Sequence, residues 1–123
     1  MRLVWVQWIP AIVWAAVLLW LGQRDPGDLP TGPEGTDKLM HAGAYGALGA
    51  LATWAAQKRS DKTRKLLRGA LVGLIAALFI GCLDEWGQST VEGRYAGWGD
   101  IVADAIGGSI GGWIIARTSA YNG

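Results

Sequence analysis

The chain lacks several features that small soluble proteins commonly rely on. It has one cysteine, Cys82, so an internal disulfide is excluded, and that cysteine has no metal-ligand spacing around it. The zinc motif H-E-x-x-H does not occur. Charged residues make up only 17% of the 123 residues. Disulfide-stabilised folds and the common zinc hydrolases are therefore not indicated.

Apolar residues are instead abundant, at 51% of the chain, and eight of them are tryptophans. A soluble domain of this size exposes a large share of its surface, so it has too little interior to hide so many apolar side chains. Lipid is the solvent that suits such a composition. The sequence therefore predicts a membrane protein.

Four apolar segments predict an all-α fold, a four-helix transmembrane bundle that forms one domain over residues 1–123. The first run lacks charge and is long enough to cross a hydrocarbon core of ~30 Å at ~1.5 Å per residue. A signal peptide is the alternative for this run, but the run exceeds a typical h-region and no small-x-small cleavage site follows it. Pro10 predicts a kink. The segments are about 3–21, 38–56, 66–86 and 100–116.

The charges along the chain predict its orientation. Lys and Arg cluster between the second and third segments, whereas the other two loops carry mostly Asp and Glu. Short loops rich in Lys and Arg stay in the cytoplasm. Both termini are therefore expected in the cytoplasm and both acidic loops outside. The basic residues are Lys58, Arg59, Lys62, Arg64, Lys65 and Arg68.

Small residues recur at four-residue spacing on three of the segments. Such rows let helix backbones approach closely in a membrane. Packing within the chain is the favoured interpretation, with a dimer interface as the alternative, so a monomer and a homodimer both stay open. The rows are Ala42, Gly46 and Ala50; Gly69 and Gly73; and Gly107, Gly108, Gly111 and Gly112.

Ionisable residues occur at one common depth. At ~1.5 Å per residue from the cytoplasmic basic anchors, His41, Asp84 and Asp100 all lie roughly 25 Å away, and Asp104 lies one turn deeper. A carboxylate facing lipid costs on the order of 3 kcal/mol or more. These side chains are expected to turn inward and form a polar pocket that opens outward. His41, Asp84 and Asp100 should then lie within about one bridging water or ion of each other.

Spacing within each helix supports this pocket. Residues four apart share a helix face, and Tyr45 continues the first of these faces one turn further in. The pairs are Asp37 with His41, Asp84 with Gln88, and Asp100 with Asp104.

Each residue also has a simpler interpretation. Asp37 and Asp100 suit helix caps, Asp84, Glu85 and Glu92 suit solvated loop charges, and His41 suits a packed histidine. Asp104 has no capping role four residues into its helix, and the shared depth favours a functional pocket.

Three ordered motifs resemble the VanZ-like family of small bacterial membrane proteins, over roughly Asp37 to Gly112. This chain has Asp104 where the family often has asparagine, and Glu92-Gly93 where it has Pro-Gly before the arginine. The motifs are Asp37-Lys38-Leu39-Met40-His41 with Tyr45; Asp84-Glu85 with Gln88; and Arg94 with Asp100 ahead of a Gly-rich helix.

The resemblance implies a role in the bacterial envelope. The founding member is associated with low-level resistance to the glycopeptide teicoplanin, which acts on cell-wall precursors outside the membrane. We therefore expect a multi-pass protein of the cytoplasmic (inner) membrane whose pocket faces outward. Its expected function is to bind or process the headgroup of an envelope lipid or cell-wall precursor, with a link to glycopeptide resistance. A membrane lipid and a lipid-linked or glycopeptide ligand are the expected partners, and no nucleic acid is expected.

The chemistry of the pocket stays open at this point. Carboxylates with a histidine suit a hard divalent cation such as Mg²⁺, and Lys38 with Arg94 suits a phosphate. A metal-assisted phospholipid or polyprenyl-phosphate enzyme and a non-catalytic protein with a structural ionic cluster are both alternatives. The binding set is Asp37, Lys38, His41, Tyr45, Asp84, Glu85, Gln88, Arg94, Asp100 and Asp104; the catalytic candidates are His41, Asp84, Glu85 and Asp100; the metal candidates are Asp37, His41, Asp84 and Asp100.

Arg94 is the only basic residue in the second outer loop. An arginine holds a carboxylate or phosphate at two points, which lysine cannot copy. We expect Arg94 to fold back over the pocket and to pair with Asp84 or Asp100.

Overall fold

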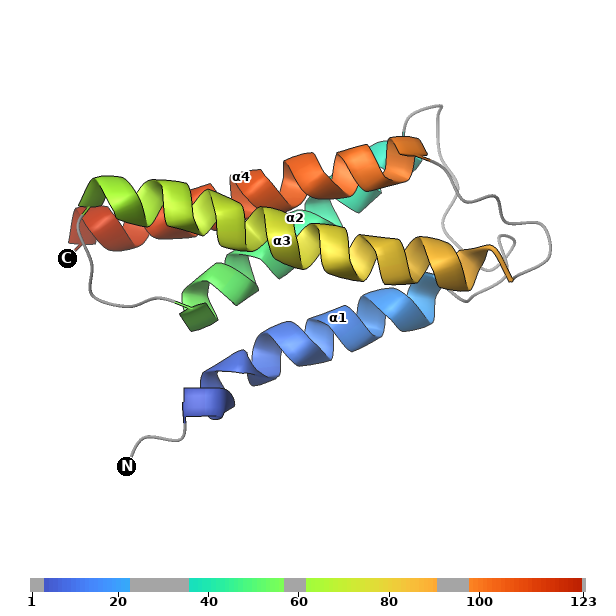
Figure 1. Ribbon diagram of the computed structural model, residues 1–123, viewed down its shortest axis with the longest axis horizontal. Coiled ribbons are helices and arrows are strands. Elements are labelled where there is room, and N and C mark those ends of the chain that lie inside the picture. The colour runs from blue at the N-terminus through green and yellow to red at the C-terminus, as the bar shows by residue number, and fades with distance from the viewer. Residues whose placement is uncertain (1–3, 23–35, 57–61, 91–97, 123) are drawn as a thin grey trace.

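The computed structural model describes residues 4–22, 36–56, 62–90 and 98–122, and these residues form helices and one short turn without any strand (Figure 1). The prediction of an all-α chain with four helices is confirmed. The elements are a 3₁₀ segment Val4–Trp8, α1 Ile9–Gly22, α2 Thr36–Ala56, α3 Lys62–Gln88 and α4 Trp98–Asn122.

Successive helices run in opposite directions along one bundle. The start of α1 and the end of α4 lie at the same end, together with the end of α2 and the start of α3 (Figure 1). Helix α4 packs along both α2 and α3, whereas α1 contacts α2 and α3 at fewer positions. The bundle is therefore a three-helix unit of α2, α3 and α4, with α1 added at its side.

Helices α2, α3 and α4 are longer than the apolar segments that predicted them, whereas α1 is shorter because the first run begins as a 3₁₀ segment. Helix α3 has 27 residues, so it is about 40 Å long at ~1.5 Å per residue. It continues through Asp84 to Gln88, which places both residues on a helix rather than in a loop. Pro10 lies in the first turn of α1, where its missing N–H costs no hydrogen bond. The predicted kink is thus replaced by a change from 3₁₀ to α-helix at Ile9.

Glycines bring the three central helices into backbone contact. A Cβ added to Gly111 on α4 would lie 2.0 Å from the carbonyl oxygen of Gly46 on α2. One added to Gly112 would lie 2.1 Å from the carbonyl oxygen of Gly69 on α3. The rows of small residues thus face each other within one chain, as close helix packing in lipid requires.

The outer surface of the bundle is strongly apolar. Ile12 is 63% exposed, and Ile75 and Phe79 are each 64% exposed. Two helical segments among the described residues, Trp5–Gly22 and Leu66–Gln88, are long and apolar enough to cross a membrane, and only 22% of each is buried. The core helix of a soluble protein would be mostly buried, although a signal sequence near the N-terminus would also pass this test.

Candidate functional site

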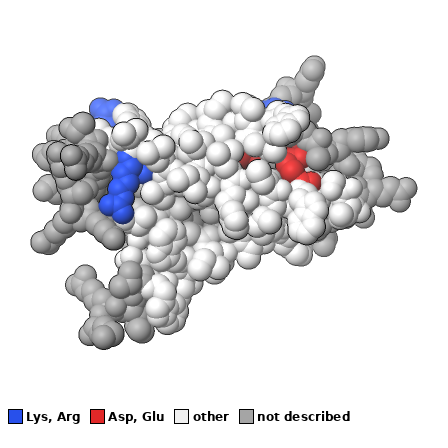
Figure 2. Space-filling model, viewed as in Figure 1, with Lys and Arg blue, Asp and Glu red and all other residues white. Residues whose placement is uncertain are grey.

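Polar side chains from α2, α3 and α4 gather at the end of the bundle opposite the chain termini. Figure 2 shows acidic side chains near that end, and basic side chains at the end where α4 finishes. Arg68 near the start of α3 and Arg117 near the end of α4 belong to the basic end. We call the polar group the outer cluster, and it consists of Lys38, His41, Tyr45, Asp84, Glu85, Gln88, Asp100 and Asp104.

One half of the outer cluster joins α2 to α4 through His41. Its Nδ1 lies 2.8 Å from Oδ1 of Asp104, and its Nε2 lies 4.0 Å from Oδ2 of Asp100. Lys38, one turn earlier on α2, pairs with Asp100 through its ammonium group. The imidazole is therefore held between two carboxylates of α4 that lie four residues apart.

The other half of the outer cluster centres on Asp84 of α3. Its Oδ2 accepts hydrogen bonds from the Tyr45 hydroxyl at 3.3 Å and from Nε2 of Gln88 at 2.8 Å. The Tyr45 ring stacks parallel to the His41 ring, with centroids 6.1 Å apart. Tyr45 thus connects the two halves, as the shared helix face predicted.

The two halves differ in their access to solvent and ligands. Tyr45, Asp84, Glu85 and Gln88 are buried. By contrast, the Lys38 side chain is 48% exposed and that of His41 is 20% exposed. A ligand at this end of the bundle can therefore reach Lys38 and His41 without rearranging the Asp84 half.

Asp104 is the most deeply placed carboxylate, with no exposed surface. Its Oδ1 faces His41, and its Oδ2 has no hydrogen-bond partner among the described residues. A Cβ added to Gly81 of α3 would lie 2.8 Å from that Oδ2. Asp104 therefore fixes the imidazole from behind, in the manner of the second-layer carboxylates that orient histidines at functional sites.

Some predicted site residues cannot be placed. Arg94 lies outside the described residues, as do Glu92 and the side chain of Asp37, so their expected roles stay predictions. Within the described part of the chain, no three His, Cys, Asp or Glu side chains come together as a possible metal site. Asp37, one of the predicted Mg²⁺ ligands, has its side chain outside the described residues, so the Mg²⁺ site stays a prediction.

Two glycines contribute to the outer cluster, and the sequence analysis missed both. A Cβ added to Gly22 at the end of α1 would lie 1.8 Å from Oδ1 of Asp84, and Gly81 makes room for Asp104. Their positions in the sequence could have identified them, because both lie near the level of the outer cluster. Gly22 ends the first apolar run, and Gly81 lies one turn before Asp84. Trp14 joins α1 to α2, because its Nε1 donates a hydrogen bond to the Ala44 carbonyl at 2.8 Å.

The residues 107–111 match the letters of the hydrolase motif G-x-S-x-G. In hydrolases that motif is a sharp turn between a strand and a helix, which exposes the serine. Here Ser109 lies inside α4 and its hydroxyl donates to the Ala105 carbonyl at 2.7 Å. Ser109 is therefore an ordinary helix serine bonded to the preceding turn.

Comparison with known proteins adds no assignment. No family model, curated protein or solved structure matches the chain.

Proposed function

We propose that this chain is a four-span protein of the bacterial inner membrane, with both termini in the cytoplasm and the outer cluster at the external face. The apolar surface of the bundle and the two segments able to cross a membrane support this proposal. Arg68 near the start of α3 and Arg117 near the end of α4 lie at the opposite end from the acidic residues, which supports the orientation because basic residues mark the cytoplasmic side.

Cysteine labelling tests the orientation. In a Cys82→Ser background, Ser89→Cys should react with an impermeant maleimide added to intact cells. Thr118→Cys should react only after the cells are opened. Both positions are exposed, at opposite ends of the bundle. Labelling of Thr118→Cys in intact cells would reverse the orientation and place the outer cluster in the cytoplasm.

The proposed function of the outer cluster is to bind the phosphate-bearing headgroup of an envelope lipid or lipid-linked cell-wall precursor. The observation that carries this proposal is the exposed edge of the cluster, where Lys38 and His41 present nitrogen donors beside Asp100. Cationic donors bind phosphate through charge-assisted hydrogen bonds. The resemblance to the VanZ-like family supports the same role and suggests a link to teicoplanin resistance.

A purely structural cluster is the second candidate. It is favoured by the Asp84 half, where Tyr45 and Gln88 both donate to Oδ2 of a buried carboxylate, because the Tyr45 hydrogen bond joins α2 to α3. The two candidates differ at His41, which a structural cluster would hold without any ligand.

His41 is the only histidine of the chain, so the side-chain NMR signal of its Nε2 can be assigned without ambiguity in protein labelled with ¹⁵N-histidine. We expect this signal to shift when short-chain phosphatidylglycerol or a polyprenyl phosphate is added to the protein in detergent. The phosphate-free analogue of each should have no effect. Lys38→Gln should weaken the response, and Arg117→Gln at the opposite end is the matched control.

Headgroup binding would be refuted if no phosphate-bearing lipid changed the chemical shift of the His41 imidazole in protein with an unchanged melting temperature. The structural interpretation would then stand. Cells offer an independent check, since expression of the chain should raise teicoplanin tolerance and Lys38→Gln should reduce that effect.

A further inference from the structure

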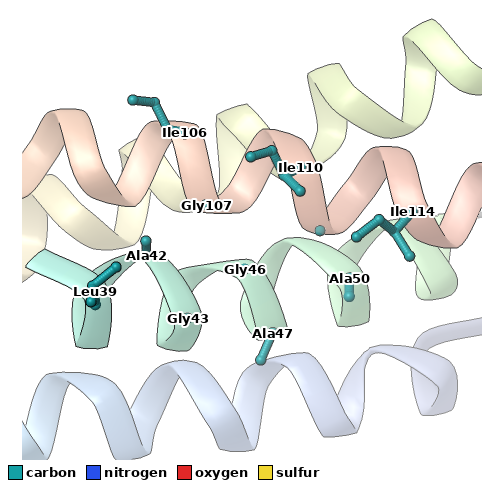
Figure 3. Close-up of a pocket in the computed structure, with 11 residues that line it drawn as sticks. Leu39, Ala42, Gly43, Gly46, Ala47, Ala50, Ile106, Gly107, Ile110 and Ile114 are labelled. Carbon is teal, nitrogen blue, oxygen red and sulfur yellow. The ribbon is translucent and has the colours of Figure 1, made fainter.

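An apolar groove of about 520 Å³ runs along the outside of the bundle between α2 and α4 (Figure 3). Isoleucines of α4 form one wall, and small residues of α2 form the other. The isoleucines are Ile106, Ile110 and Ile114, and the small residues include Gly43, Ala47 and Ala50.

The groove is open where bulky side chains would normally fill the surface. A Cβ added to Gly43 would meet no atom within 4 Å, in contrast to the glycines that pack between helices. Ile106 and Ile110 are 54% and 53% exposed. The groove is therefore an apolar space that no side chain fills, rather than part of the packing between helices.

One end of the groove lies close to the outer cluster along α2. Its lining begins at Leu39, the residue after Lys38. Lys38 reaches from α2 across to the first turn of α4, since its ammonium pairs with Asp100 and a Cβ added to Gly99 would lie 3.2 Å from its Cε. A cationic side chain thus bridges α2 to α4 one residue before the lining of the groove begins.

The length of the groove matches one leaflet of a bilayer. From Leu39 to Ala50 the α2 wall rises about 16 Å at ~1.5 Å per residue, close to half of a ~30 Å hydrocarbon core. An acyl chain of a phospholipid spans about that depth, whereas a polyprenyl chain crosses more than one leaflet. A second copy of the protein in the groove would not explain why a cationic side chain lies near one end of it.

We infer that the groove holds one acyl chain of an anionic phospholipid whose phosphate lies at Lys38. This inference rests on the proposed headgroup function and names the lipid class for the same site. The acyl chain fills the groove between α2 and α4. The lipid phosphate and Asp100 both bind the Lys38 ammonium. The positive charge of Lys38 near one end of the groove and the apolar walls along it favour binding of a phospholipid over a neutral lipid.

Native mass spectrometry of the detergent-solubilised protein tests the inference with phosphatidylglycerol bearing long acyl chains. The wild-type chain should retain one phosphatidylglycerol and should retain the matching diacylglycerol poorly. Gly43→Leu fills the groove from a position with open space, so the fold should persist while retention is lost. Ala47→Leu should act in the same way, and Ala16→Leu on the exposed face of α1 is the matched control.

The outcomes separate the inference from the proposed function. Equal retention of phosphatidylglycerol by Gly43→Leu, Ala47→Leu and Ala16→Leu would refute the acyl-chain site. If the His41 signal still responds to short-chain phosphatidylglycerol, headgroup binding survives that failure. Mass spectra showing a dimer that Gly43→Leu dissociates would also refute the inference, by assigning the groove to a second copy. Equal retention of diacylglycerol and phosphatidylglycerol would refute the role of Lys38.

Discussion

Gly73 lies where α3 comes closest to α4, and it gives the sharpest test of the fold. A Cβ at this position would lie 2.0 Å from the carbonyl oxygen of Gly108 and 3.2 Å from Cα of Gly112. Because Cβ atoms essentially never approach other atoms within 3.0 Å, Gly73→Ala requires the two backbones to separate by about 1 Å.

The cost of that separation can be estimated from packing. A gap of 0.5–1 Å forfeits roughly a quarter to a half of the dispersion energy between facing atoms. Inserted methyl groups in close-packed interiors cost about 1–3 kcal/mol. Alanine also gains about 1 kcal/mol over glycine in a helix. We therefore expect Gly73→Ala to lower the free energy of unfolding by up to about 2 kcal/mol.

Gly43→Ala is the matched control, because the same change on α2 meets nothing within 4 Å. It should be neutral or stabilising by up to about 1 kcal/mol through helix propensity alone. Unfolding of both variants in mixed micelles, followed by tryptophan fluorescence, measures the difference. If Gly73→Ala is as stable as Gly43→Ala, the backbones of α3 and α4 do not approach as closely as described.

Three further predictions concern polar contacts in the bundle. Tyr45→Phe removes a donor to the buried Asp84 and should cost about 1–3 kcal/mol of unfolding free energy, whereas an unchanged value would mean that the 3.3 Å contact is not a hydrogen bond. Gly22→Ala places a methyl group onto Asp84 and should loosen α1, seen as faster hydrogen exchange in α1 than in α4; uniform exchange would contradict this. Thr53→Val removes the 3.0 Å bond from Oγ1 of Thr53 to the Gly69 carbonyl and should cost about 0.6 kcal/mol in thermal melts, and a stabilised variant would contradict it.

The sequence predicted the helices well, because long apolar runs and their flanking charges report directly on helix number. It underestimated the lengths of α2, α3 and α4. Basic residues from Lys62 to Lys65 resembled a loop in hydropathy, yet they form the first turn of α3. Hydropathy measures depth in the membrane rather than backbone conformation, so a polar helix end and a polar loop have the same signal.

The sequence predicted which residues share a level, but it did not predict their partners. His41 and Asp37 share a helix face by spacing, whereas the described partner of His41 is Asp104, 63 residues away. The rotation of each helix about its axis decides such pairs. That rotation follows from backbone contacts such as Gly46 with Gly111, which spacing alone does not match to each other.

The side position of α1 has a consequence for how the protein is made. Helix α1 precedes its partners α2 and α3 in the sequence, and its Leu18 packs with Tyr45 of α2 and Ala77 of α3. The glycine contacts of α2, α3 and α4 form when α4 is complete, and the Trp14 hydrogen bond to Ala44 holds α1 to that unit. Among the described helices, α1 is thus able to be the last to join the bundle and, by the same weak docking, the first to leave it.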